Sequence, residues 1–293
     1  MGANIEIILV GIMVCACCAL PGTFLVLRGM SMMTDAISHT VLLGIVLGFF
    51  VSDGNIGSPV VVLFAILTGL LTVWLTELLH STKLVNKGSA IGIVFPFLFA
   101  TAVIIIAKFA KNVHLDVEHI IFGDITFVPF ERFETVDYDF GPKALIILFI
   151  IFVINLAIIS LFYKEFKVST FDSEYAKVIG ISTTFINYLL MSLVSVTSFG
   201  AFQAVGVIVV IAFMVGPALT ARLFTDRLGN MLILSIIIGT IDSILGYILA
   251  IYFDVSISGM QAFVIGTVFF VVLLVTKRKN IFKSKKVIIS SNS

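Results

Sequence analysis

The stretch RGMSMMTDAISHTVLLG, residues 28–44, lies between two hydrophobic segments of the chain. It contains Asp35 and His39, which are four residues apart, so on a helix they project from one face about one turn apart. Carboxylate oxygen favours hard ions such as Mn²⁺, and imidazole nitrogen favours Zn²⁺, Fe²⁺ and heavier first-row ions. The pair therefore predicts a transition-metal site without naming the metal.

The alternative is that His39 only satisfies Asp35 through an i,i+4 hydrogen bond. The surroundings favour the metal site, because an apolar run from Val41 to Val51 follows directly. Ionisable groups carried into a membrane are costly enough that a functional role is the default hypothesis. Asp35 and His39 are therefore the candidate metal ligands.

The composition is that of a polytopic integral membrane protein. Hydrophobic residues make up 60% and charged residues 12% of the 293, with a mean hydropathy of +1.20, whereas soluble domains carry about 25% charged residues. The net charge of +1 indicates no particular partner, because a membrane protein sorts its charges by side. The amino terminus lacks the features of a cleaved signal peptide, so the first segment is expected to stay as a span.

We predict an all-α fold with about nine transmembrane helices, and eight or ten also fit the pattern, since a span needs about 20 apolar residues. The boundary between Ser198 and Gln203 is the weakest, because Gly200 also suits a bent helix. The predicted spans are 5–27, 35–51, 57–79, 89–108, 144–162, 184–200, 203–221, 229–251 and 257–276.

Basic residues are distributed unequally between the two sets of connections. Fourteen of the 18 Lys and Arg residues fall on the side of Arg28 and the carboxyl-terminal tail. By the positive-inside rule this side is cytoplasmic. With nine spans the amino terminus is outside and the carboxyl terminus inside. We expect one transmembrane domain, 1–276, followed by a basic cytoplasmic tail, 277–293.

Three stretches resemble the ABC-type manganese/zinc/iron permeases. Residues 28–44 are similar to that family's signature, including the arginine, the Asp-Ala-Ile-Ser-His core and the trailing glycine. The stretch STFDSEYAKVIG, residues 169–180, resembles the family's cytoplasmic segment that docks on the ATPase. The third stretch contains LVSVT, VGVIVV and GPA within residues 193–218. The resemblance covers roughly residues 5–276.

This resemblance implies an ABC importer permease fold, in a multi-pass protein of the cytoplasmic or inner cell membrane. It implies a transported divalent metal, with Mn²⁺ favoured over Zn²⁺ and Fe²⁺, and no permanently bound cofactor. Its implied partners are ATPase subunits docked at 169–182, an extracellular or periplasmic metal-binding protein, a second permease chain of the same or a related kind, and membrane lipid. Nothing indicates nucleic acid.

The chain is not predicted to be an enzyme. It contains no G-x-x-x-x-G-K-[ST] phosphate loop, so ATP hydrolysis is expected on a separate ATPase chain. Two other functions stay open. The first is a proton-coupled secondary metal carrier, which would have no use for an ATPase-docking segment. The second is a membrane sensor or scaffold, which the Asp/His pair in an apolar setting disfavours.

Asp242 is a lone carboxylate within the predicted span 229–251. It is compatible with three roles, as a third metal ligand, as a proton-coupled group, or as a neutral carboxyl held against Thr240 or Ser243. Pro217 is expected to kink or unwind its span. The cysteines of the first span are expected to be small packing residues rather than metal ligands; they are Cys15, Cys17 and Cys18.

The long connection at about 109–143 is expected outside, and it carries seven acidic residues. They either attract cations and a protein that delivers them, or solvate an ordinary loop. His114 and His119 lie in this connection with ligand-type residues between them. Because the stretch after His119 resembles a structural part of the permease family, we do not predict a second metal site there.

Overall fold

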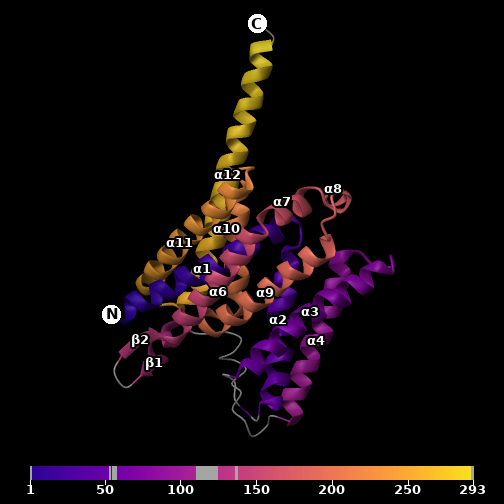
Figure 1. The fold of residues 1–293 in the computed structure, drawn as a ribbon. Coiled ribbons are helices and arrows are strands. Elements are labelled where there is room, and N and C mark those ends of the chain that lie inside the picture. The colour runs from indigo at the N-terminus through magenta and orange to yellow at the C-terminus, as the bar shows by residue number, and fades with distance from the viewer. Residues whose placement is uncertain (1, 53, 55–57, 110–124, 136–137, 292–293) are drawn as a thin grey trace.

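The structure is a computed structural model that describes residues 2–52, 54, 58–109, 125–135 and 138–291. It is almost entirely helical, as the composition predicts (Figure 1). In chain order the elements are α1 (Ala3–Leu27), α2 (Ser31–Val51), α3 (Pro59–Ser81), α4 (Lys87–Phe109), η1 (Ile125–Phe130), β1 (Arg132–Thr135), β2 (Tyr138–Pro142), α6 (Lys143–Leu161), α7 (Tyr163–Phe171), α8 (Ser173–Val178), α9 (Thr183–Val205), α10 (Val207–Arg222), α11 (Leu228–Phe253) and α12 (Ile257–Ser291).

Eight of the nine predicted spans fall on one long helix each, and the ninth, 203–221, runs from the end of α9 across Gly206 into α10. Within the described part of the chain, eight helices are long and apolar enough to cross a membrane, and α10 is a shorter apolar helix. The 16 residues of α10 extend about 24 Å at 1.5 Å per residue, which is less than the roughly 30 Å of a bilayer's hydrocarbon core. The predicted all-α, multi-pass architecture is confirmed.

The predicted break between Ser198 and Gln203 is wrong. Helix α9 continues through both residues to Val205, and the break is the single residue Gly206, with φ 80° and ψ 167°. This region of backbone space is essentially restricted to glycine. Pro217 does not unwind its span, because α10 remains helical on both sides of it, and the alternative of a kink stays a prediction.

The helices form two groups joined by α9 (Figure 1). One group is α2, α3 and α4, and the other is α1, α10, α11 and α12. Helix α9 packs on α1, α2 and α3, and α6 packs on α1 and α9. The main hydrophobic core runs through this junction, so the position of α2 depends on both groups.

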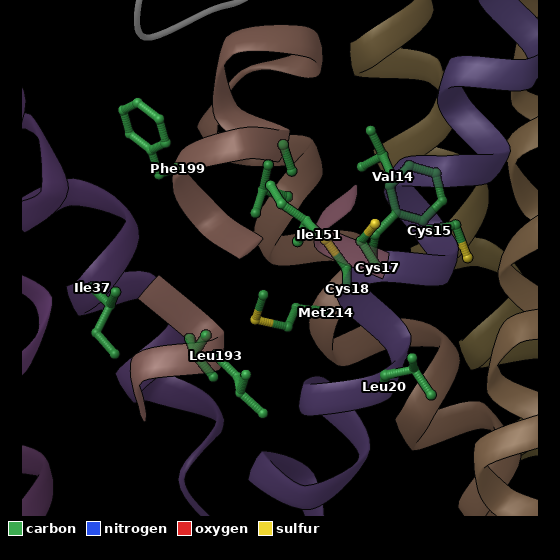
Figure 2. Close-up of a cluster of buried hydrophobic side chains, with 14 of the residues drawn as sticks. Val14, Cys15, Cys17, Cys18, Leu20, Ile37, Ile151, Leu193, Phe199 and Met214 are labelled. Carbon is green, nitrogen blue, oxygen red and sulfur yellow. The ribbon is translucent and has the colours of Figure 1, made fainter. Parts of the chain in front are cut away.

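The cysteines of α1 lie in this core (Figure 2). All three are free and buried, and the Cys17 thiol donates to the carbonyl oxygen of Leu148 at 3.1 Å. Side chains from several helices surround them, including Ile151, Leu193 and Met214. The prediction that they are packing residues is confirmed.

The two ends of the bundle differ. Helices α7 and α8 lie at one end, and the β1–β2 hairpin lies at the other (Figure 1). The hairpin was not predicted; it pairs Glu134 with Asp139 in an antiparallel register. His114, His119 and much of the acidic connection lie outside the described residues. Helix α12 continues beyond the bundle at the α7–α8 end, so the expected domain boundary at residue 277 lies within one helix and stays a prediction.

Helices α2 and α3 approach closely because α2 presents glycines to α3. A Cβ atom on Gly44 would lie 2.5 Å from the carbonyl oxygen of Phe64, and one on Gly48 would lie 2.7 Å from the Cα of Val61. Small residues allow such backbone contact between membrane helices, where lipid removes the hydrophobic driving force. The Thr72 hydroxyl also donates to the Thr40 hydroxyl at 2.7 Å.

The basic residues predict that the α7–α8 end is cytoplasmic and the hairpin end extracellular. A cysteine at Phe130, a side chain 79% exposed at the hairpin end, should react with a membrane-impermeant thiol reagent in intact cells. A cysteine at Leu84, 86% exposed between α3 and α4, should react only after permeabilisation. The opposite labelling pattern would mean that the topology is inverted.

Adding one methyl group at the α2–α3 contact should destabilise the bundle. The Gly44→Ala side chain would overlap the α3 backbone, and overpacking costs about 1–3 kcal/mol. Thermal unfolding of the purified protein in detergent measures the loss. Gly266→Ala on α12 is the matched control, because no atom lies within 4 Å of its added Cβ. Equal stability of the two variants would contradict the tight contact.

Candidate metal site

The metal-site helix α2 starts from a well-defined turn at the end of α1. Gly29 has φ 65°, its N–H donates to the Val26 carbonyl, and the N–H of Met30 donates to the Leu25 carbonyl at 2.9 Å. These are the two hydrogen bonds of a Schellman motif, which favours glycine at its left-handed position. The turn reverses the chain so that α2 begins at Ser31.

Asp35 and His39 lie together on one face of α2, as the sequence predicts. The Nε2 atom of His39 is 3.4 Å from Oδ1 of Asp35, and the side chains are 27% and 49% exposed, respectively. Because the Asp35 carboxylate is half exposed, it is not buried in the hydrophobic core of this chain. The pair is therefore accessible to an ion or a partner from the side.

The imidazole of His39 is held by aromatic rings of α4. The ring centroids of Phe95 and Phe99 lie 5.3 Å and 5.6 Å from that of His39. Such contacts restrict the ring's rotation and contribute packing energy. They leave Nε2 on the side of Asp35, where both groups can face the same ion.

Two hydroxyl contacts fix the rotation of α2 about its own axis. Besides the Thr72–Thr40 bond to α3, the Ser38 hydroxyl donates to Ser198 of α9 at 3.4 Å. Ser38 and Thr40 are buried, whereas Asp35 is not. Packing on α3 and α9 thus turns the Asp35–His39 face away from the core.

Two ligands are too few for a first-row metal ion, which takes at least four. No group of three or more His, Cys, Asp and Glu side chains that could hold a metal occurs in the part of the chain that the structure describes. If Asp35 and His39 bind a metal, they make only an open half-site. Water or a second chain would have to supply the other ligands.

Asp242 is not a third ligand to this site within one chain. It is 1% exposed on α11, which packs on α1, α10 and α12. Neither of its carboxylate oxygens has a hydrogen-bond partner among the described residues. Of the three roles left open for Asp242, a carboxyl held against Thr240 or Ser243 is not supported, because the Thr240 hydroxyl donates to the Ile236 carbonyl and the Ser243 hydroxyl accepts from Gln261.

Residues 169–182, the segment predicted to dock on the ATPase, comprise the end of α7, the short helix α8 and the turn before α9. The Asp172 side chain caps α8 by accepting from the N–H of Tyr175 at 2.9 Å, which is a role that Asp commonly takes at a helix start. A hollow of about 540 Å³ beside α7 is lined by Lys164, Lys167, Phe171 and Tyr175, among others. Phe171 and Tyr175 are exposed, so an apolar surface with basic neighbours faces outward from the bundle.

Sequence reasoning missed the residues that hold the pair in place. Phe95 and Phe99 have i,i+4 spacing, and so do Thr68, Thr72 and Thr76 on α3. These repeats, together with Gly44 and Gly48, signal helix faces that pack closely. They do not say which helix each face meets, which is why the contacts were not predicted.

Known proteins similar to this chain are membrane components of metal transport systems. The model of the ABC 3 transport family matches residues 4–276. The manganese transport system membrane protein MntD of Bacillus subtilis (strain 168) is 46% identical over 260 residues, covering 89% of this chain and 88% of that protein. The zinc transport system membrane protein TroD of Treponema pallidum (strain Nichols) is 40% identical over 280 residues, covering 96% and 76%.

The fold also matches a solved structure. PsaBC from Streptococcus pneumoniae in complex with Fab superposes with a TM-score of 0.77 at 29% sequence identity. The match covers 93% of this chain and 91% of that chain. The agreement therefore extends over nearly all of the helices described above.

If Asp35 and His39 jointly ligate an ion, Asp35→Asn and His39→Ala should each abolish metal uptake. Each change removes one of the chain's two candidate ligands, and removal of a costly ionisable group seldom unfolds the helix that bears it. Uptake by cells, normalised to the amount of membrane-inserted protein, measures the effect.

The control variant is His80→Ala, because this histidine is exposed at the end of α3 and lies on neither α2 nor the α7–α8 segment. It should take up metal at the wild-type rate. Wild-type uptake by both Asp35→Asn and His39→Ala would show that the pair is only a helical hydrogen bond.

Proposed function

The chain belongs to the ABC 3 transport family, and we propose that it is the membrane permease subunit of an ATP-driven importer of divalent transition metals. One observation carries the proposal. A carboxylate and an imidazole lie 3.4 Å apart on a half-exposed face of α2, inside a multi-pass membrane bundle. Ionisable side chains in membrane-spanning helices are costly and typically mark ion pathways.

Mn²⁺ is the proposed substrate, with Zn²⁺ and Fe²⁺ as alternatives. The similarity to a manganese transport protein supports this order. The ligand types are consistent with it, because a mixed oxygen and nitrogen set suits Mn²⁺ as well as Zn²⁺ and Fe²⁺. The ion is cargo that passes through, and we propose no permanently bound cofactor.

A second permease chain, identical or related, would complete the site. Two copies of the Asp35–His39 pair facing each other across a symmetric interface would supply four ligands. Four ligands meet the minimum coordination number of the ion, which the two ligands of a single chain do not. The exposure of Asp35 on the isolated chain supports this arrangement, since the interface would cover it.

ATPase subunits are proposed to dock on α7 and α8. The exposed apolar side chains Phe171, Tyr175 and Val178 lie there with Lys164 and Lys167 nearby. A metal-binding protein is proposed to dock at the opposite, hairpin end and to release the ion there. Binding and hydrolysis of ATP would then alternate the access of Asp35 and His39 between the two sides.

Membership of an ABC family argues against the proton-coupled carrier. Under our proposal, uptake into proteoliposomes that contain the permease and its ATPase should require ATP and should persist when the proton gradient is collapsed. Uptake that follows the proton gradient and ignores ATP would refute the proposal. Competition among Mn²⁺, Zn²⁺ and Fe²⁺ in the same assay ranks the substrates.

Glu174→Arg in the first turn of α8 should uncouple ATP hydrolysis from uptake. Charge reversal at a contact with a partner introduces repulsion that costs several kcal/mol, while Asp35 and His39 stay intact. Uptake should therefore fall sharply while metal binding is kept. Arg222→Glu, a charge reversal at an exposed residue at the end of α10, is the control and should leave uptake unchanged. Unchanged uptake and ATPase association in Glu174→Arg would place the ATPase contact elsewhere.

A further inference from the structure

Arg28 lies at the turn between α1 and α2, and its guanidinium reaches across to α7. Its Nε donates to the Thr170 hydroxyl at 3.0 Å, and its Nη2 donates to the Ser169 hydroxyl at 2.8 Å. Its Nη1 donates to Oδ1 of the Asn187 side-chain amide on α9 at 3.4 Å. One side chain therefore contacts the proposed ATPase-facing segment and the bundle at once.

The contacts continue from Asn187 to α3. The Asn187 amide donates to Oε1 of Glu77 at 2.7 Å, and the Tyr188 hydroxyl donates to Oε2 of Glu77 at 3.1 Å. Glu77 lies on α3, the helix that touches α2 through Gly44. Helix α2 is thus reached from α7 by two routes, directly through the turn at Arg28 and indirectly through α9 and α3.

Apolar packing reinforces the same junction. Phe166 of α7 is buried against Phe24 of α1, with ring centroids 5.1 Å apart. The Ser169 hydroxyl, which accepts from Arg28, donates in turn to the Phe166 carbonyl at 3.2 Å. The inner face of α7 is therefore anchored to the end of α1, while its other face lines the outward hollow.

Burial lowers the pKa of Arg28 to about 10, so the side chain stays charged and keeps all of its donors at neutral pH. Its described hydrogen-bond partners are neutral oxygens of Ser169, Thr170 and Asn187. A planar guanidinium holds several acceptors in a fixed geometry, which a lysine ammonium cannot reproduce. The contact suits transmission of movement, because one rigid group binds two elements simultaneously.

We propose that Arg28 is a positioning residue that ties the ATPase-facing segment α7–α8 to the start of α2, so that movement of α7 is transmitted to Asp35 and His39. Asp35 is the fifth residue of α2, only about 6 Å along the helix axis from Ser31. A shift of the turn therefore displaces the proposed metal ligands as a rigid unit. This inference rests on the proposed transport function.

The test compares Arg28→Ala with wild type in proteoliposomes containing the assembled permease and ATPase. The measured quantity is Mn²⁺ transported per ATP hydrolysed, because a partly misfolded sample lowers both rates and leaves their ratio unchanged. We expect complex assembly to persist and the ratio to fall by roughly 5- to 150-fold, the range typical of coupling between sites. Arg222→Ala, an exposed arginine at the end of α10, should keep the wild-type ratio.

Thr170→Val, which removes one acceptor, should lower the ratio less than Arg28→Ala. The double variant should be no worse than Arg28→Ala alone, because residues acting through one contact are not additive. Arg28→Lys should recover part of the ratio, and it serves as the test variant if Arg28→Ala does not assemble. A wild-type ratio in Arg28→Ala, or in Arg28→Lys when only that variant assembles, overturns the inference, as does full additivity with Thr170→Val.

Asp35→Asn separates this inference from the function on which it rests. If Asp35→Asn takes up Mn²⁺ at the wild-type rate, the proposed metal pathway fails, whatever Arg28 does. If Asp35→Asn loses uptake while Arg28→Ala keeps the wild-type ratio, the pathway stands and only the role of Arg28 fails.

Discussion

The contact between α2 and α3 is the constraint on which the site depends. The hydrophobic effect does not drive helix association within lipid, so membrane helices are held together by close packing and interhelical hydrogen bonds. Gly44 and Gly48 provide the close packing, and the Thr72–Thr40 bond provides a polar contact. Together these contacts fix which face of α2 is buried. If α2 were rotated so that its opposite face packed inward, Asp35 would lie in the apolar core.

In the proposed pathway Asp35 and His39 form an open, two-ligand site, which suits an ion that must leave again. A complete shell supplied by one chain would hold the ion as a structural metal does, whereas conduction requires binding weak enough for release. In the proposed pathway the shell is complete only when two chains bring their Asp35–His39 pairs together. Small movements of α2 would then change the affinity for the ion, because ligand distances around a metal tolerate little variation.

Hydropathy predicted the helices well because the bilayer dictates their length, but it misplaced the α9–α10 break. Ser198 looked like part of a loop, yet its hydroxyl is satisfied by Ser38 within the bundle. Gly200 suited either a break or a bent helix, and in the structure it lies inside α9 and admits the side chain of Ile151, which a Cβ atom would displace. Gly206 is the break because of its backbone conformation, and a sequence does not distinguish a glycine used for packing from one used for a turn.

The predicted juxtaposition of Asp35 with His39 needed only local helix geometry, because the two residues lie four positions apart. The Arg28 contacts join residues separated by 141, 142 and 159 positions, and no local rule predicts such pairs. Sequence comparison with a family singled out residues 28–44 and 169–180 as separate stretches. In the folded chain the first residue of one stretch binds the first two residues of the other, so the proposed metal-binding and ATPase-facing parts meet at a single guanidinium group.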